Sequence, residues 1–178
     1  MDPFMKENEN VTARAGIEDE LLSKFGIDHR LIDDYQVLCL PENFDGAASI
    51  DELYDTHDGI NLCKQLSDKG LKSGNSFDLK IHKNFYGRKS LDIWLGTLWV
   101  LDKLVLPLVV SIVGSIIGPP IYTHLKGKMQ KESRPPNLRP IAHLTLIIRK
   151  GGELQILEYE GDSAAVKSSL DKLVKELL

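Results

Sequence analysis

The residues of this chain that could support chemistry are a histidine–aspartate pair and a run of aspartates, and neither forms a complete catalytic set. His57 and Asp58 are adjacent in YDTHDGIN, and such a pair binds a metal for hydrolysis only with further His and Asp ligands at set distances. None follows at such a spacing, so we expect His57 to be a partly buried helix histidine. Asp51 and Asp55 precede Asp58 at helical spacing and could gather a hard cation, but a solvated acidic stripe is the plainer interpretation.

The remaining reactive side chains are scattered, and no nucleotide or nucleophile motif accompanies them. GxGxxG, GxSxG and HExxH are absent, and HLKGK lacks the glycine loop and the Ser or Thr of a phosphate-binding loop. Cys39 and Cys63 lack CxxC spacing and lie in apolar surroundings, which indicates reduced, buried thiols, with a disulfide between them as the alternative. The other histidines that we considered are His82, His124 and His143. We therefore expect no catalytic residue, no metal and no cofactor, and hence no enzyme.

The composition is that of a fairly acidic protein with an ordinary core. The chain has 178 residues and a formal net charge of −4, which gives no general reason to bind nucleic acid or acidic lipid. Its 42% of hydrophobic residues suffice for a core, and its 27% of charged residues exclude a protein embedded wholly in a membrane. MDPF before Met5 looks like an added tag, and we expect no secretory signal. We expect residues 1–15 to be disordered.

The first half, residues 16–90, predicts an α/β part. Apolar residues at helical spacing, a short apolar run closed by proline, a capping box of Ser49 and Glu52, and an alternating segment mark its elements. These elements are a helix at 16–26, a strand at 35–41, a helix from Ser49 to about Asp68 and a strand at 76–82.

The clearest local structure is a C-terminal β-hairpin followed by a helix. HLTLIIRK and ELQILEYE are separated by only two glycines, which suit a two-residue turn. Pairing Lys150 with Glu153 fixes the register and places His143 opposite Glu160. This ββα part, residues 141–178, buries too little to be stable alone, so we expect it to pack on the N-terminal part.

Between these parts lies the uncharged stretch LVLPLVVSIVGSIIGPP, residues 104–120. Its small residues share one side, but that side is small rather than polar, so we expect no face of this helix to meet water. We predict one long, kinked hydrophobic helix over about 91–118, within a hydrophobic segment 91–122 that is transmembrane or buried in an interface. The small residues, which predict helix association, are Ser111, Gly114, Ser115 and Gly118.

Two interpretations of this helix stay open. Aromatic residues flank it and a basic tail follows, as at membrane-crossing helices. However, its uncharged helical part is only about 22 Å long, against about 30 Å for a hydrocarbon core. A helix buried in protein is the alternative. The residues predicted to lie at the membrane interface are Trp94, Trp99, Tyr122, Lys126 and Lys128.

Basic residues lie on both sides of the hydrophobic segment, the second group in a proline-rich linker at 123–140. Each could contribute about 1 kcal/mol of attraction to anionic headgroups, and solvated loops are the alternative. Aromatics interleaved with basic residues in HKNFYGRK also suit single-stranded nucleic acid, but in an acidic chain we do not expect that partner. The basic residues are Lys80, His82, Lys83, Arg88 and Lys89 before the segment, and Lys126, Lys128, Lys131 and Arg134 after it.

Together these patterns predict an α+β protein with a small mixed sheet, built from two strands of the first half and the C-terminal hairpin, with flanking helices. The leading hypothesis is a non-enzymatic, self-associating, membrane-associated protein. Its soluble part would lie in the cytoplasm and bind a partner or signal, while the hydrophobic helix anchors in or perturbs the bilayer. The alternative is a cytoplasmic interaction subunit whose apolar helix forms the core of a homo- or hetero-oligomer.

Overall fold

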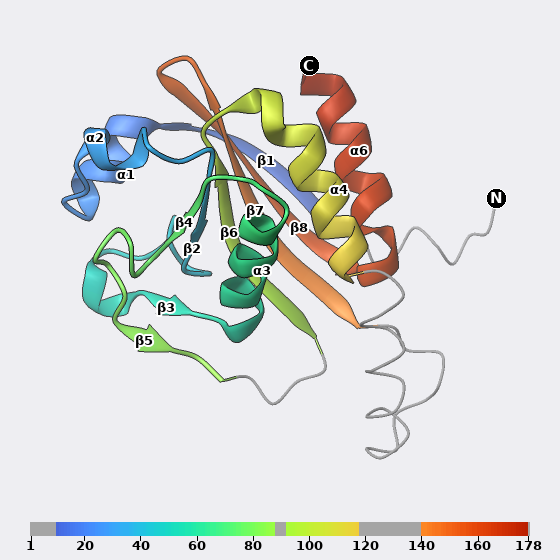
Figure 1. Ribbon diagram of the computed structural model, residues 1–178, viewed down its shortest axis with the longest axis horizontal. Coiled ribbons are helices and arrows are strands. Elements are labelled where there is room, and N and C mark those ends of the chain that lie inside the picture. The colour runs from blue at the N-terminus through green and yellow to red at the C-terminus, as the bar shows by residue number, and fades with distance from the viewer. Residues whose placement is uncertain (1–9, 88–91, 118–139, 178) are drawn as a thin grey trace.

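The C-terminal hairpin forms as the sequence predicts, from β7 (Ile141–Lys150) and β8 (Glu153–Asp162). Lys150 faces Glu153 and His143 faces Glu160, which confirms the predicted register. Gly151 adopts a φ of 68°, a conformation that this tight turn demands and that glycine adopts without strain. The computed structural model describes residues 10–87, 92–117 and 140–177, and in it the hairpin belongs to a larger sheet (Figure 1).

That sheet is mixed and has six strands in the order β1-β8-β7-β6-β2-β4. β6 pairs with β7 and β2 with β4 in parallel, and the other neighbours are antiparallel. A separate pair, β3 with β5, is parallel. The remaining strands are β1 (Asn10–Ile17), β2 (Val37–Leu40), β3 (Tyr54–Asp55), β4 (Ser73–Asn75), β5 (Asn84–Phe85) and β6 (Ile93–Val100).

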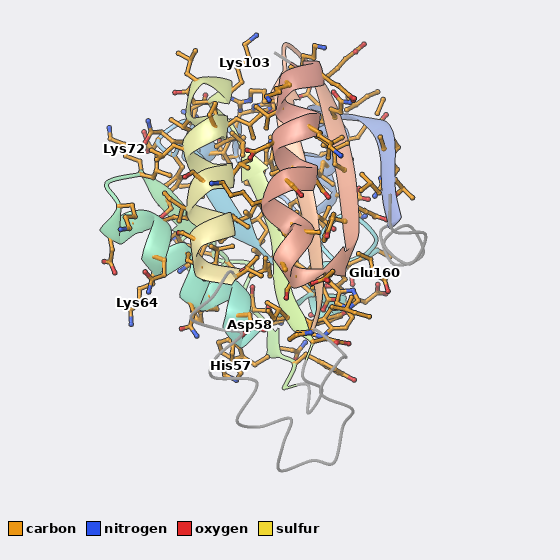
Figure 2. The ribbon with its side chains drawn as sticks, turned by 90° about the vertical axis from the view of Figure 1, so that its right-hand side faces the viewer. His57, Asp58, Lys64, Lys72, Lys103 and Glu160 are labelled. Carbon is orange, nitrogen blue, oxygen red and sulfur yellow. The ribbon has the colours of Figure 1, made fainter. Side chains whose placement is uncertain are left out.

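Three helices cover one face of the sheet, and α4 lies between the other two (Figures 1 and 2). They are α3 (His57–Asp68), α4 (Leu106–Ile117) and α6 (Val166–Leu177). Their apolar faces meet the inward side chains of β2, β6, β7 and β8 in one buried cluster. Short 3₁₀ turns at Lys103–Val105 and Ser163–Ala165 lead into α4 and α6.

The opposite face is covered by α1 (Glu18–Lys24), α2 (His29–Ile32) and the chain that follows β2, including a 3₁₀ turn at Ile50–Glu52. Phe44 and Trp99 are fully buried there, with ring centroids 6.2 Å apart. Arg149 Nε lies 2.7 Å from Glu18 Oε1, which ties the hairpin to the start of α1. The structure is thus α+β with a mixed sheet, as predicted, but with more strands than the sequence indicates.

The prediction of one long helix over 91–118 is wrong. Residues 93–100 form strand β6, which is buried on both sides, and only Leu106–Ile117 is α-helical. A strand covered on both faces is a continuous apolar run, and periodicity alone does not distinguish such a run from a buried helix. In the part of the chain that the structure describes, no helix has the length and apolar character that a membrane crossing requires.

Four smaller predictions also need correction. Residues 10–15 belong to β1 rather than to a disordered terminus, and 76–82 form a turn at 76–80 and irregular chain rather than a strand. The helix predicted from Ser49 begins at His57, because Thr56 caps it by accepting a hydrogen bond from the backbone N–H of Gly59 at 3.1 Å. Residues 16–26 become the end of β1 followed by α1.

Strand β6 contains a bulge at Gly96, which has a φ of 78°. A Cβ there would lie 2.8 Å from the carbonyl oxygen of Leu40 in β2. We expect Gly96→Ala to lower the free energy of unfolding by about 1–3 kcal/mol, measured by urea denaturation. Gly46→Ala is the matched control, since nothing lies within 4 Å of its Cβ position, and we expect a change below about 0.5 kcal/mol. Equal effects of the two substitutions would contradict this account of the bulge.

Candidate functional site

Helix α4 has one face in the core and one at the surface. Leu104, in the turn before the helix, is 83% exposed, and Leu108 is 46% exposed. Ser111 and Ser115 are also exposed, and the spacing of these four residues places them in one stripe along the helix. The expectation that no face of this helix meets water is therefore wrong. We call Leu104, Leu108, Ser111 and Ser115 the outer stripe of α4. The side chains on the buried face are Leu106, Val109, Val110, Ile112, Val113 and Ile117.

The outer stripe carries no charge, whereas the helices on either side of it do. On α3, Lys64 and Asp68 are exposed, and on α6, Lys167, Lys172 and Lys175 are exposed. Figure 2 shows α4 beside α6, with Lys64 on the side of α3. An apolar centre bordered by charged residues is the arrangement found in protein–protein interfaces. The helical layer therefore has the composition of a contact surface.

The small residues predicted to mediate helix association are divided between two surroundings. Ser111 and Ser115 lie in the outer stripe, and the hydroxyl of Ser115 donates to the carbonyl of Ile112 at 2.8 Å. A Cβ at Gly114 would lie 2.7 Å from the side chain of Lys167, so this glycine lets α6 approach α4 within the same chain. Gly118 lies outside the described residues. Association through these residues stays a prediction.

Both tryptophans predicted to lie at a membrane interface belong to strand β6. Trp99 is fully buried in β6, on the sheet face opposite α4. Trp94, also in β6, stacks on His143 with ring centroids 3.5 Å apart. The other three, Tyr122, Lys126 and Lys128, lie outside the described residues. Contact of these five residues with lipid stays a prediction.

The three aspartates that could have gathered a cation have separate partners. Asp51 forms an exposed ion pair with Lys83 at 3.1 Å, and Asp58 accepts a hydrogen bond from the backbone N–H of Trp94 at 3.1 Å. Asp55 is buried, and its partners are Ser76 and His82. They therefore form no acidic stripe. Among the residues that the structure describes, no three His, Cys, Asp or Glu side chains are placed to hold a metal ion.

Buried Asp55 instead joins two side chains that are distant in sequence. The hydroxyl of Ser76 donates to Asp55 Oδ1 at 2.6 Å, and His82 Nδ1 lies 2.7 Å from Oδ2. A histidine held by a carboxylate at Nδ1 and near a serine is also the combination found in nucleophilic sites. However, the only serine of this group is itself fully buried and bound to the carboxylate. The geometry therefore indicates a clamp that holds residues 76–82 against β3 rather than a nucleophile with its base.

Aromatic rings surround this clamp at the surface. Phe77 stacks on His82 with centroids 4.1 Å apart, and Phe85 stacks on His57 at 5.3 Å. Phe77, Phe85 and Tyr86 are each about half exposed. His57 is exposed at the start of α3 (Figure 2), which corrects the expectation that it is partly buried. This second cluster is therefore a group of partly exposed aromatic rings around the clamp.

A shallow hollow of about 210 Å³ lies over β6, β7 and β8, and glutamates line it. Glu158 pairs with Arg14 at 3.1 Å, and Glu42 and Glu160 also line the hollow. Acidic side chains on a sheet surface do not by themselves define a ligand. The outer stripe of α4 remains the strongest candidate.

Comparison of the chain with protein-family models, with curated proteins and with solved structures finds no match.

The clamp gives a direct test of its structural role. We expect Asp55→Asn to lower the free energy of unfolding by about 1–3 kcal/mol, since an amide cannot accept both hydrogen bonds as the carboxylate does. Asp51→Asn removes an exposed ion pair, and we expect less than about 0.5 kcal/mol. Chemical denaturation of both variants measures the difference. A tolerated Asp55→Asn would show that these bonds contribute little.

Proposed function

We propose that this protein is a non-enzymatic interaction protein that self-associates through the outer stripe of α4. The observation that supports the proposal most strongly is the 83% exposure of Leu104 in a stripe whose four side chains carry no charge. Isolated exposed leucines are common on soluble proteins. Here Leu104 is continued by Leu108 and two small residues and is bordered by charged helices, and this combination favours a contact.

A symmetric pair of chains suits this stripe, because it then contacts its own copy. If the two α4 helices cross antiparallel near Ser111, the large Leu108 of one chain lies beside the small Ser115 of the other. Burial of Leu104 and Leu108 contributes about 4–8 kcal/mol to such a dimer. Association costs an amount of similar size, so we expect a weak, reversible dimer.

A lipid surface is the second candidate occupant of the same stripe. It is favoured by the position of Lys103 next to exposed Leu104, because a lysine can reach the headgroups while the leucine enters the apolar layer. The basic linker at 123–140, outside the described residues, would add attraction to anionic lipid. We rank this second, since the contact would involve only one short stripe.

The test is a concentration series of the purified chain in analytical ultracentrifugation without detergent. We expect Leu104→Glu combined with Leu108→Glu to raise the dimer Kd at least about 30-fold, with circular dichroism unchanged. Leu31→Glu is the matched control, because Leu31 is 37% exposed on α2, on the opposite side of the sheet. Its Kd should equal that of the unchanged chain.

Two results would contradict self-association through this stripe. One is an unchanged chain that stays monomeric to about 1 mM, a concentration at which even weak dimers form. The other is a double variant that dimerises as well as the control. Flotation with vesicles of neutral and anionic lipid distinguishes the second candidate, because binding lost in the same double variant would assign the stripe to lipid.

A further inference from the structure

The two cysteines meet in the core between α3 and the sheet. Cys39 in β2 is 3% exposed and Cys63 in α3 is 5% exposed, and both thiols are free. Cys39 pairs in register with Asn75 of β4, and Cys63 Sγ donates to the carbonyl of Gly74 at 3.6 Å. Both sulfurs therefore lie beside the same point of β4. The two thiols also interact with each other there, and each is the largest influence on the pKa of the other.

This contact makes the two sulfurs chemically unequal. The contact with Cys39, and a hydrogen bond from Ser73, lower the pKa of the Cys63 thiol from its usual value despite burial. The same contact, together with burial, raises the pKa of Cys39 well above its usual value. Because the thiolate is the nucleophile, this difference favours Cys63 as the attacking sulfur and Cys39 as the resolving one.

On the side of β4, only a short edge strand covers the two cysteines. β4 has only three residues, forms one edge of the sheet and pairs with β2 alone. The hydroxyl of Ser73 donates to the backbone carbonyl of Cys63 at 3.2 Å, so β4 is also bonded to α3 at this cysteine. Short edge strands open at lower free energy than the centre of a sheet. Local opening of β4 is therefore the route by which a small oxidant reaches Cys63.

We propose that Cys39 and Cys63 form a redox-modifiable pair that closes to a disulfide between β2 and α3 when the protein meets a peroxide. Cys63 thiolate attacks one oxygen of hydrogen peroxide, the O–O bond breaks, and the departing hydroxide takes a proton to leave as water. The product is a sulfenic acid on Cys63. The sulfur of Cys39 then attacks the Cys63 sulfur, the S–O bond breaks, and the hydroxide leaves as water with the proton of Cys39. Two thiols are oxidised and one peroxide is reduced to two waters.

This inference does not depend on self-association. The covalent link would join α3 to β2, the strand beside the edge strand β4, where packing and hydrogen bonds alone now hold the helix. Because α3 borders α4, the two proposals can be tested on the same protein, but failure of either leaves the other intact.

The experiment treats the reduced, folded full-length chain with hydrogen peroxide and then maps its peptides by mass spectrometry. We expect a peptide pair joined through Cys39 and Cys63, with both free thiols lost and the chain unchanged in size on a non-reducing gel. A dimedone probe supplies the second readout. Cys39→Ser should leave a dimedone adduct on Cys63, whereas Cys63→Ser should leave Cys39 unreacted.

The result that overturns the proposal is a folded chain whose thiols both persist at a peroxide dose that oxidises glutathione fully. A disulfide formed only in urea, or only between chains, overturns it as well. A dimedone adduct on Cys39 in the Cys63→Ser variant would reject the assigned order of attack. The mass measurement on the unchanged chain stands even if a serine variant fails to fold.

Discussion

The structure depends on covering both faces of one sheet. β6 lies near its centre, and from Leu95 to Val100 its side chains are buried on both sides. Helices α3, α4 and α6 supply the cover on one face, and α1, α2 and the chain after β2 supply it on the other. Neither face of such a strand can meet water without a large loss of apolar burial. The most hydrophobic segments of the sequence therefore lie mostly inside the molecule, and helix α4, in the uncharged stretch, packs its larger apolar face against the sheet.

Helix α4 nevertheless has more apolar surface than the sheet needs. A helix that only covers a sheet has a polar outer face, as α3 and α6 do. α4 has serines and leucines there instead. The cover of the sheet does not account for this uncharged outer side, and the proposed contact with a second copy would account for it.

Features that neighbouring residues determine could be predicted from the sequence, whereas features that distant segments determine could not. The hairpin register follows from alternation and two glycines, so it was predictable from neighbouring residues. Strand β6 was mistaken for helix because its pattern reflects a cover on both faces that distant segments provide. The capping box at Ser49 was a false signal, since Thr56 caps the helix instead. The Asp55 clamp and the two faces of α4 depend on residues brought together by folding, although the spacing of Leu104, Leu108, Ser111 and Ser115 already contained the stripe.

The position of β1 has a consequence for how the chain acquires its structure. β1 pairs along its length with β8, so that Asn10 lies opposite Glu160. This pairing gives the sheet a high contact order, because β1 and β8 are far apart in the sequence. During synthesis, β1 stays without its strand partner until β8 has left the ribosome, and its exposed Val11 and Ile17 are then open to other chains. Pairing with β8 then satisfies one side of β1, which remains an edge strand of the finished sheet.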